Sequence, residues 1–233
     1  MKIHNCIAFV TGANRGIGAA VVEALLAAGA AKVYAAARSA IRHPNPRVVP
    51  LALDVTDGAA IAAAAAAAGD VGLLINNAGA LEGGDLFAAG AEAVERQLAV
   101  NALAPLRLAL ALLPALRRSQ GAIVNILSVV AWAPMPGLAG YSASKAAAAS
   151  LTGSLRATLA SDGVSVHAVF PGPVDTAMAA GIDLPKTSPA EVAGAILAGV
   201  EAGEAEIFPD AFSRQIAAGW FADPRAVAEQ FAA

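Results

Sequence analysis

A glycine-rich turn between an apolar run and an amphipathic stretch constrains the fold of this chain more than any other feature. The apolar residues 7–10 lead directly into Thr11-Gly12-Ala13-Asn14-Arg15-Gly16-Ile17-Gly18, and residues 19–28 follow with helical periodicity up to Gly29, a predicted C-cap. This order predicts a strand, a tight turn and a helix, which form the first half of a βαβ unit. The amino end of such a helix presents free backbone N–H groups, so the turn predicts a phosphate-binding site.

The spacing of the glycines narrows the kind of site. It is Gly-x-x-x-Gly-x-Gly rather than Gly-x-Gly-x-x-Gly, and no Gly-Lys-Ser/Thr follows as a P-loop would require. A glycine-rich turn alone could be only a tight loop. Its place after a first strand, with a second strand predicted at 32–37, favours a dinucleotide site.

Apolar runs and helical stretches alternate along the rest of the chain, which predicts a parallel sheet covered on both faces. We expect strands near residues 4–10, 32–37, 47–53, 71–75, 121–127, 164–170 and 204–208. The predicted fold class is α/β, a single Rossmann-like doubly wound domain over residues 1–233 with about seven strands. A chain of 233 residues is long enough to bury one sizeable core.

The apolar composition requires a membrane location to be weighed. Hydrophobic residues make up 58% of the chain and the mean hydropathy is +0.62. The longest charge-free run, 119–144, contains prolines, glycines and polar residues and predicts a strand plus a loop, not a spanning helix. Much of the score comes from alanine, a helix former, and no signal peptide precedes the first strand. We therefore expect no membrane partner.

Charge, cysteine and histidine content exclude other classes. A net charge of −3 is not the footprint of a nucleic-acid-binding protein. The single Cys6 excludes an internal disulfide and fits a reducing compartment, so we expect a cytoplasmic protein. The three histidines are dispersed, and no residues have the spacing of metal ligands.

The segment Tyr141-Ser142-Ala143-Ser144-Lys145 predicts a catalytic pair. Residues i and i+4 lie on one face of a helix, so a phenol and an ammonium can act on one substrate. A nearby cation would lower the pKa of Tyr141 from about 10 and make the phenol usable as a proton donor and acceptor. Ser128, at the end of an apolar run, can supply a hydroxyl to the same oxygen. Such Tyr–Lys pairs alone are common on solvated helices, and this one gains weight from the motifs before it.

Taken in order, these motifs resemble the short-chain dehydrogenase/reductase family over residues 2–208, which implies binding of a nicotinamide cofactor. Asp54-Val55 after the third predicted strand resembles the family's adenine-contacting acid, and Asn76-Asn77-Ala78-Gly79 closes the fourth strand as the family motif does. Pro171-Gly172-Pro173-Val174-Asp175-Thr176 matches the segment that clasps the nicotinamide. The cofactor contacts implied by the resemblance are Gly12, Asn14, Arg15, Gly16, Ile17, Gly18, Arg38, Asp54, Val55, Asn77, Ala78, Gly79, Tyr141, Lys145, Pro171, Gly172, Val174 and Thr176.

The resemblance also implies a catalytic set of Asn101, Ser128, Tyr141 and Lys145. In it, Ser128 polarises the carbonyl, Tyr141 exchanges the proton, and Lys145 lowers the pKa of the phenol and holds the nicotinamide ribose. Asn101 would fix a water that links Lys145 to solvent. Two alternatives stay open: Ser128 could be only a strand-end cap, and Asn101 only a polar residue that bends a helix.

The end of the second predicted strand indicates NADP(H) rather than NAD(H). An NAD site needs an acid there to bind the ribose hydroxyls, whereas this chain reads Ala35-Ala36-Ala37-Arg38. A guanidinium matches a 2′-phosphate well, so we expect Arg38 and Arg15 to bind it, with Arg42 and Arg47 adding to the field. The alternative is a solvated basic loop. Residues 39–47 lack the usual helix and 56–70 are short, both beside the adenine end.

An apolar substrate pocket is expected between Ser128 and Tyr141 and after the clasp. Its predicted lining is Val130, Trp132, Met135, Leu138 and Met178. The expected substrate is a hydrophobic or aromatic ketone, aldehyde or secondary alcohol. Trp132 could instead pack against the edge of the sheet. Alanine-rich faces on the predicted helices at 91–118 and 141–161 indicate a homodimer or homotetramer.

Other functions on the same fold remain in view. A non-catalytic dinucleotide sensor or scaffold would usually lack the Tyr or the Lys. A lyase, epimerase or dehalogenase could use Ser128 and Tyr141 without net redox change, although the intact clasp argues against cofactor-free versions. A methyltransferase would also open with a glycine turn but needs neither Tyr141 nor Lys145. An oxidoreductase accounts for more of the motifs than any of these.

Overall fold

The computed structural model describes residues 1–232, which form a seven-stranded, all-parallel sheet with the strand order β3-β2-β1-β4-β5-β6-β7. The order runs outward in two directions from β1 and β4, as in a doubly wound α/β fold, and the predicted fold class is confirmed. The strands are β1 (Ile7–Thr11), β2 (Lys32–Ala37), β3 (Val48–Ala52), β4 (Leu73–Asn76), β5 (Ala122–Ile126), β6 (Ser165–Val169) and β7 (Glu206–Ile207).

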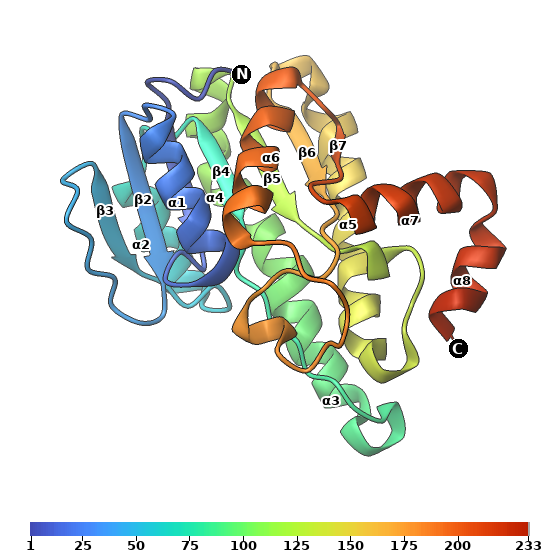
Figure 1. Ribbon diagram of the computed structural model, residues 1–233. Coiled ribbons are helices and arrows are strands. Elements are labelled where there is room, and N and C mark those ends of the chain that lie inside the picture. Colours follow the sequence, from blue (N-terminus) through green and yellow to red (C-terminus); the bar gives the residue numbers. More distant parts are fainter. Residues whose placement is uncertain (233) are drawn as a thin grey trace.

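Helices cover both faces of this sheet (Figure 1). On one face, α1 (Gly16–Ala27) and α6 (Pro189–Ala202) bury Leu25 and Ile196 against the sheet residues Val10, Ile75 and Val124. The other face is covered by α2 (Gly58–Ala67), α4 (Ala104–Ser119) and α5 (Ala139–Leu159). Because both faces are buried, the strands are near-continuous apolar runs rather than alternating ones.

The expected irregularity beside the adenine end is present. No helix forms between β2 and β3, where residues 39–47 are loop, and a single alanine-rich helix, α2, lies between β3 and β4. Asp57 starts α2 by accepting hydrogen bonds from the N–H groups of Ala59 and Ala60. The loop contradicts one expectation. Arg47 does not face the predicted adenine end, because its guanidinium donates to the carbonyls of Leu26, in the last turn of α1, and Ala30, just past that helix.

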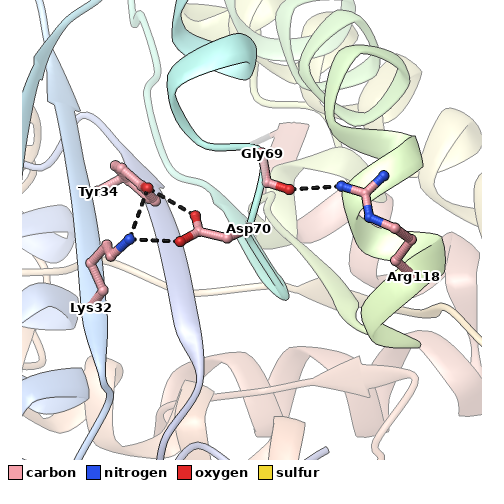
Figure 2. A network of polar contacts seen from close by, with 5 residues as sticks. All are labelled: Lys32, Tyr34, Gly69, Asp70 and Arg118. Atoms are coloured by element: carbon pink, nitrogen blue, oxygen red, sulfur yellow. Dashed lines mark hydrogen bonds and ion pairs between the residues drawn. The ribbon is translucent and has the colours of Figure 1, made fainter.

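Polar contacts tie the amino end of β2 and the carboxyl end of α4 to the turn between α2 and β4 (Figure 2). The Lys32 ammonium and the Tyr34 hydroxyl both donate to the Asp70 carboxylate, at 2.6 and 2.8 Å. Burial alone would raise the pKa of Asp70, but these hydrogen bonds outweigh it and the pKa is lowered. Arg118, at the end of α4, donates to the Gly69 carbonyl at 2.7 Å. The network lies at the amino ends of the strands, whereas the predicted site lies at their carboxyl ends.

The predicted helix at 91–118 is longer and less regular than expected. Helix α3 (Leu86–Leu98) continues through a π-helical turn, η1 (Ala99–Leu103), into α4. The combined stretch, residues 86–119, is long and apolar enough to span a membrane, and it is the one such helix in the described part of the chain. A core helix of a globular protein passes the same test, and here one side of α4 is packed against the sheet.

The C-terminal tail forms two helices instead of the single one predicted from residue 212. Helix α7 (Ala211–Ala222) ends at Asp223, and Pro224 begins α8 (Pro224–Ala232). A proline is well suited to the first turn of a helix but not to its interior, which explains the break. Figure 1 shows α7 and α8 extending away from the sheet beyond β7. The last residue, 233, lies outside the described residues.

Candidate active site

One elongated cavity of about 860 Å³ runs along the carboxyl ends of the strands, where ligands bind in open α/β sheets. Nearly all of the residues predicted to bind cofactor or substrate line it. These are Gly12, Asn14, Arg15, Gly16, Ile17, Arg38, Asp54, Val55, Asn77, Ala78, Gly79, Ser128, Val130, Met135, Leu138, Tyr141, Lys145, Pro171, Gly172, Val174, Thr176 and Met178. Segments as far apart in the chain as Gly12 and Met178 therefore meet in one space.

The glycine turn leaves the amino end of α1 open toward this cavity. Arg15 is the N-cap residue of α1, and its side chain makes no capping hydrogen bond. Gly16 has φ +55°, a left-handed conformation in which a β-carbon would be strained. The free N–H groups of the first helical turn and the positive end of the helix dipole suit a bound pyrophosphate.

Gly18 has a different role from the one expected, since it does not line the cavity. A β-carbon at this position would lie 2.2 Å from the Gly12 carbonyl oxygen and 2.5 Å from the Asn77 amide nitrogen. The turn therefore closes on the helix so tightly that only glycine fits. Gly18 shapes the phosphate site from behind.

The end of β4 is fastened to the glycine turn by Thr11. The Thr11 hydroxyl accepts hydrogen bonds from the N–H groups of Asn77 and Ala78, both at 2.9 Å. In return the Asn77 amide donates to the carbonyls of Thr11 and Gly12. Asn77 thus holds the glycine turn in place and is itself one of the residues that line the cavity.

The adenine end of the cavity carries charges of both signs. Arg15 and Arg38 are exposed at its rim, and Asp54 follows β3 on the same side. Hydrogen bonds from the Thr56 N–H and hydroxyl, with a smaller effect of the Arg38 charge, lower the pKa of Asp54. Asp54 is therefore a carboxylate at neutral pH, able to accept hydrogen bonds from ribose or adenine.

The opposite end of the cavity brings Ser128, Tyr141 and Lys145 together. Ser128 follows β5 and caps a short 3₁₀ turn, accepting from the Val130 N–H at 3.4 Å. Tyr141 and Lys145 lie on the first turns of α5, and the Lys145 ammonium is 5.6 Å from the centre of the Tyr141 ring. Lys145 is 4% exposed and donates to the Ile126 carbonyl at 2.7 Å.

Lys145 does not lower the pKa of Tyr141 below its ordinary value, contrary to expectation. Burial raises the pKa of Tyr141 to about 12, and a hydrogen bond from Ser128 only partly offsets it. Burial likewise lowers the pKa of Lys145 to about 8. Desolvation is the largest effect on both groups, because burial disfavours both the phenolate and the ammonium. At neutral pH the phenol is protonated and is a proton donor.

Asn101 lies next to this group but outside the cavity, inside the π-helical turn. Its amide donates to the Ala80 carbonyl and the Ser144 hydroxyl, both at 2.8 Å, and accepts from the Ala80 N–H at 2.9 Å. Ser144 in turn donates to the Tyr141 carbonyl at 2.7 Å. The amide thus connects the loop after β4 to the catalytic turn of α5. π-helical turns are frequent at functional sites. That Asn101 holds a water beside Lys145 stays a prediction.

Trp132 does not line the substrate end of the cavity, contrary to expectation. Its ring packs against Phe170 at 4.5 Å, Phe208 at 5.5 Å and Trp220 at 6.0 Å between centroids. The tryptophan therefore anchors α7 to the sheet, the alternative fate considered for it. The sequence predicts Trp220 and Phe221 to be exposed unless they meet a neighbour, and both contact Trp132. Phe221, at 5.8 Å between ring centroids, nevertheless stays 68% exposed.

Sequence patterns missed several lining residues. Phe212, at the start of α7, lines the cavity, as do Leu81 after β4 and Val100 in the π-helical turn. The sequence predicts Phe212 to be part of a helix in the C-terminal tail, and nothing in its local pattern indicates that it contacts residues 171–176. Within residues 1–232 no group of three or more His, Cys, Asp or Glu side chains is arranged to hold a metal ion.

Comparison with known proteins extends these observations. A family model described as short chain dehydrogenase matches residues 6–186. The 3-oxoacyl-[acyl-carrier-protein] reductase FabG of Vibrio cholerae is 35% identical over 214 residues, which cover 87% of this chain and 85% of that protein.

Two solved structures are also similar. A short chain dehydrogenase from Burkholderia cenocepacia in complex with NADP is 42% identical with a TM-score of 0.95, and the match covers 99% of each chain. A short-chain dehydrogenase from Sphingobium yanoikuyae in complex with NADPH is 32% identical with a TM-score of 0.78, covering 95% of this chain and 93% of that one.

Proposed function

This chain belongs to the short-chain dehydrogenase/reductase family, and from that premise we propose that it is an NADP(H)-dependent reductase that interconverts a ketone or aldehyde and its alcohol. That it is an oxidoreductase with a nicotinamide cofactor follows from the family. One observation carries the finer proposal. Ser128, Tyr141 and a buried Lys145 lie at one end of a cavity whose other end carries two arginines and no acid at the end of β2.

The residues of the cavity fit a dinucleotide phosphate. The uncapped amino end of α1 suits the pyrophosphate, and the close contact of Gly18 with Gly12 leaves the space that it needs. Arg15 and Arg38 would pair with the 2′-phosphate, since a planar guanidinium matches phosphate oxygens in a bidentate manner. Relatives that bind NADP and NADPH support this choice.

The catalytic proposal assigns one task to each side chain. A bound nicotinamide supplies the reducing equivalent. Negative charge then develops on the carbonyl oxygen, where the Ser128 hydroxyl donates a hydrogen bond worth roughly 3 kcal/mol in the transition state. Tyr141, protonated at neutral pH because burial raises its pKa to about 12, donates its proton to that oxygen. The Lys145 ammonium stabilises the phenolate that this transfer leaves.

The lining around these groups supports an apolar substrate. Aliphatic and aromatic side chains surround the space next to Ser128 and Tyr141, contributed by Val130, Met135, Leu138, Met178 and Phe212. A substrate without charge would desolvate at little cost there, whereas a carboxylate would lose hydration without a partner. We therefore propose a hydrophobic or aromatic carbonyl compound.

The test is oxidation of NADPH, followed by absorbance with a panel of aromatic and aliphatic ketones and aldehydes and with NADH in parallel. Turnover of an apolar carbonyl that Tyr141→Phe reduces about 10²- to 10⁴-fold, with NADPH binding retained, would support the mechanism. The chain has one other tyrosine, so Tyr34→Phe is a matched control that keeps its activity. Normal activity in Tyr141→Phe would refute the assignment. Tight NADPH binding without any turnover would point to a nucleotide sensor or scaffold.

We further propose that the protein assembles as a homodimer or homotetramer through α4 and α5. Leu110 of α4 is 57% exposed, and Leu103, at the end of the π-helical turn before α4, is 41% exposed, so two large apolar side chains are open to contact with a second copy. Light scattering coupled to gel filtration would give the mass of the assembly. A monomer with the unaltered sequence, or no change of mass in Leu110→Asp, would contradict this interface.

A further inference from the structure

We propose that Asp210, in the segment between β7 and α7, is a positioning residue that fixes the nicotinamide clasp at 171–176 through the Gly172 N–H. The inference rests on the proposed cofactor site and deepens it. Asp210 is outside every motif that the sequence presents, 38 residues from its partner in the clasp. It is 3% exposed, and no cationic side chain pairs with it in residues 1–232.

A buried carboxylate is costly unless its oxygens accept hydrogen bonds. The two oxygens of Asp210 have different tasks. Oδ1 accepts from the Ser213 N–H at 2.7 Å and so caps α7, in a reciprocal capping box with the Ser213 hydroxyl. Oδ2 accepts from the Gly172 N–H at 2.9 Å. Helix capping alone needs only the first oxygen, so the second contact is an additional function.

The chemistry of the clasp makes this contact decisive for its orientation. Prolines have no N–H, so in Pro171-Gly172-Pro173 the only backbone donor is that of Gly172. The neighbouring carbonyls are already held, that of Pro171 by the Val129 N–H and that of Pro173 by the Thr187 N–H. The Gly172 N–H and the Pro171 carbonyl belong to one peptide plane. Asp210 holds this plane at its N–H, at 2.9 Å, and the Val129 N–H holds it at its carbonyl by a longer contact of 3.3 Å.

Packing shows that the clasp and the start of α7 lie in direct contact. A β-carbon on Gly172 would lie 2.7 Å from Cδ1 of Phe212 and 3.0 Å from Oδ1 of Asp210. Phe212 also lines the cavity. The clasp is connected to the catalytic residues as well, since Val129, which holds Pro171, follows Ser128 directly. A rotation of the Gly172 peptide would thus move the wall beside the reacting carbon.

The test separates this role from a structural one by comparing a whole cofactor with a fragment that lacks nicotinamide. Dissociation constants are measured for NADPH and for adenosine 2′,5′-bisphosphate, or for NADH and AMP if the unaltered protein binds NADH. In Asp210→Asn one oxygen remains for two N–H groups, and when that oxygen caps α7 the NH2 group faces the Gly172 N–H. Asp210→Ser keeps a cap for α7 without reaching the clasp. For both variants we expect the Kd of the dinucleotide to rise about tenfold and that of the fragment to stay unchanged.

Ser213→Ala is the matched control, because it removes half of the capping box and leaves the carboxylate on the Gly172 N–H. It is expected to lower the melting temperature as the Asp210 variants do, with both dissociation constants unchanged. Equal weakening of dinucleotide and fragment in the Asp210 variants, or no weakening of either, would overturn the proposal. Absence of turnover in the unaltered protein would refute the reductase instead, since the binding comparison does not depend on turnover.

Discussion

Replacing Arg38 by alanine tests the proposed choice of cofactor. Arg38 follows β2 directly and lines the same end of the cavity as Arg15, and no carboxylate lies at the end of the strand to bind a ribose 2′-hydroxyl. The guanidinium would therefore contribute to binding the 2′-phosphate of NADPH and little to binding NADH. Removal of the guanidinium is expected to change the preference for NADPH over NADH and to leave the catalytic step unchanged.

The magnitude follows from the exposure of the side chain. A hydrogen bond to a charged group contributes about 1.5–3 kcal/mol when it is shielded from water. Arg38 is exposed at the rim, where solvent and salt screen charges, so we expect slightly less than this range, about 1.4 kcal/mol, or about tenfold in affinity. If Arg15 contributes independently, the double variant loses about a hundredfold.

The assay is the ratio of kcat/KM for NADPH to that for NADH. In Arg38→Ala this ratio is expected to fall about tenfold, with the value for NADH unchanged, and the loss should shrink as the ionic strength of the buffer rises. Arg42→Ala is the control, because Arg42 is in the same basic loop but does not line the cavity. An unchanged ratio in Arg38→Ala, or an equal loss in Arg42→Ala, would refute the argument that a phosphate pocket exists at this rim.

Three further substitutions test the packing and electrostatics of the fold. Burial, partly offset by a hydrogen bond to the Glu204 carbonyl, lowers the pKa of His167. The contribution of its neutral ring to the free energy of unfolding is therefore full above pH about 6.5 and falls as the pH drops toward the lowered pKa, by up to about 1.4 kcal/mol per pH unit. Urea titrations of His167→Gln should lose this pH dependence. Gly18→Ala should destabilise the protein and abolish nucleotide binding, because its β-carbon meets the glycine turn, whereas Gly194→Ala, with open space around it, should stabilise α6 by about 0.5–1 kcal/mol in thermal melts. Trp220→Ala should cost about 2 kcal/mol in denaturant titrations by removing the stack on Trp132, and the exposed Phe221→Ala well under half of that.

The outcomes of these substitutions can be distinguished. If His167→Gln removes the fall in the free energy of unfolding at acid pH and changes nothing at higher pH, the effect is due to His167, because the fold buries its neutral ring. If Gly18→Ala bound nucleotide normally, the close approach of α1 to the turn would not be required. If Trp220→Ala were as stable as the unaltered chain, the aromatic cluster would not hold α7.

The sequence alone predicted the sheet and most of the site because both depend on local or sequential properties. Strand positions followed from apolar runs, and all seven predicted strands are present, although β1 begins later than expected and β7 has only two residues. Ligand sites on an open parallel sheet lie at the carboxyl ends of its strands, so motifs at those ends were bound to meet. The run Ser188-Pro189-Ala190-Glu191 has the spacing that predicts a capping box, and α6 begins there with Ser188 as its N-cap.

Only the tertiary structure decided what each side chain faces and how it ionises. Trp132 lies in an aromatic cluster rather than in the pocket, and Arg47 binds carbonyls beyond α1 rather than a phosphate. The pKa of Tyr141 is raised rather than lowered, because the free energy of desolvation depends on everything packed around the phenol. Asp210 reaches Gly172 only because β7 pairs beside β6. Residue order and periodicity determine elements and their sequence along the sheet, whereas orientation, burial and long-range partners arise from packing, which no local pattern encodes.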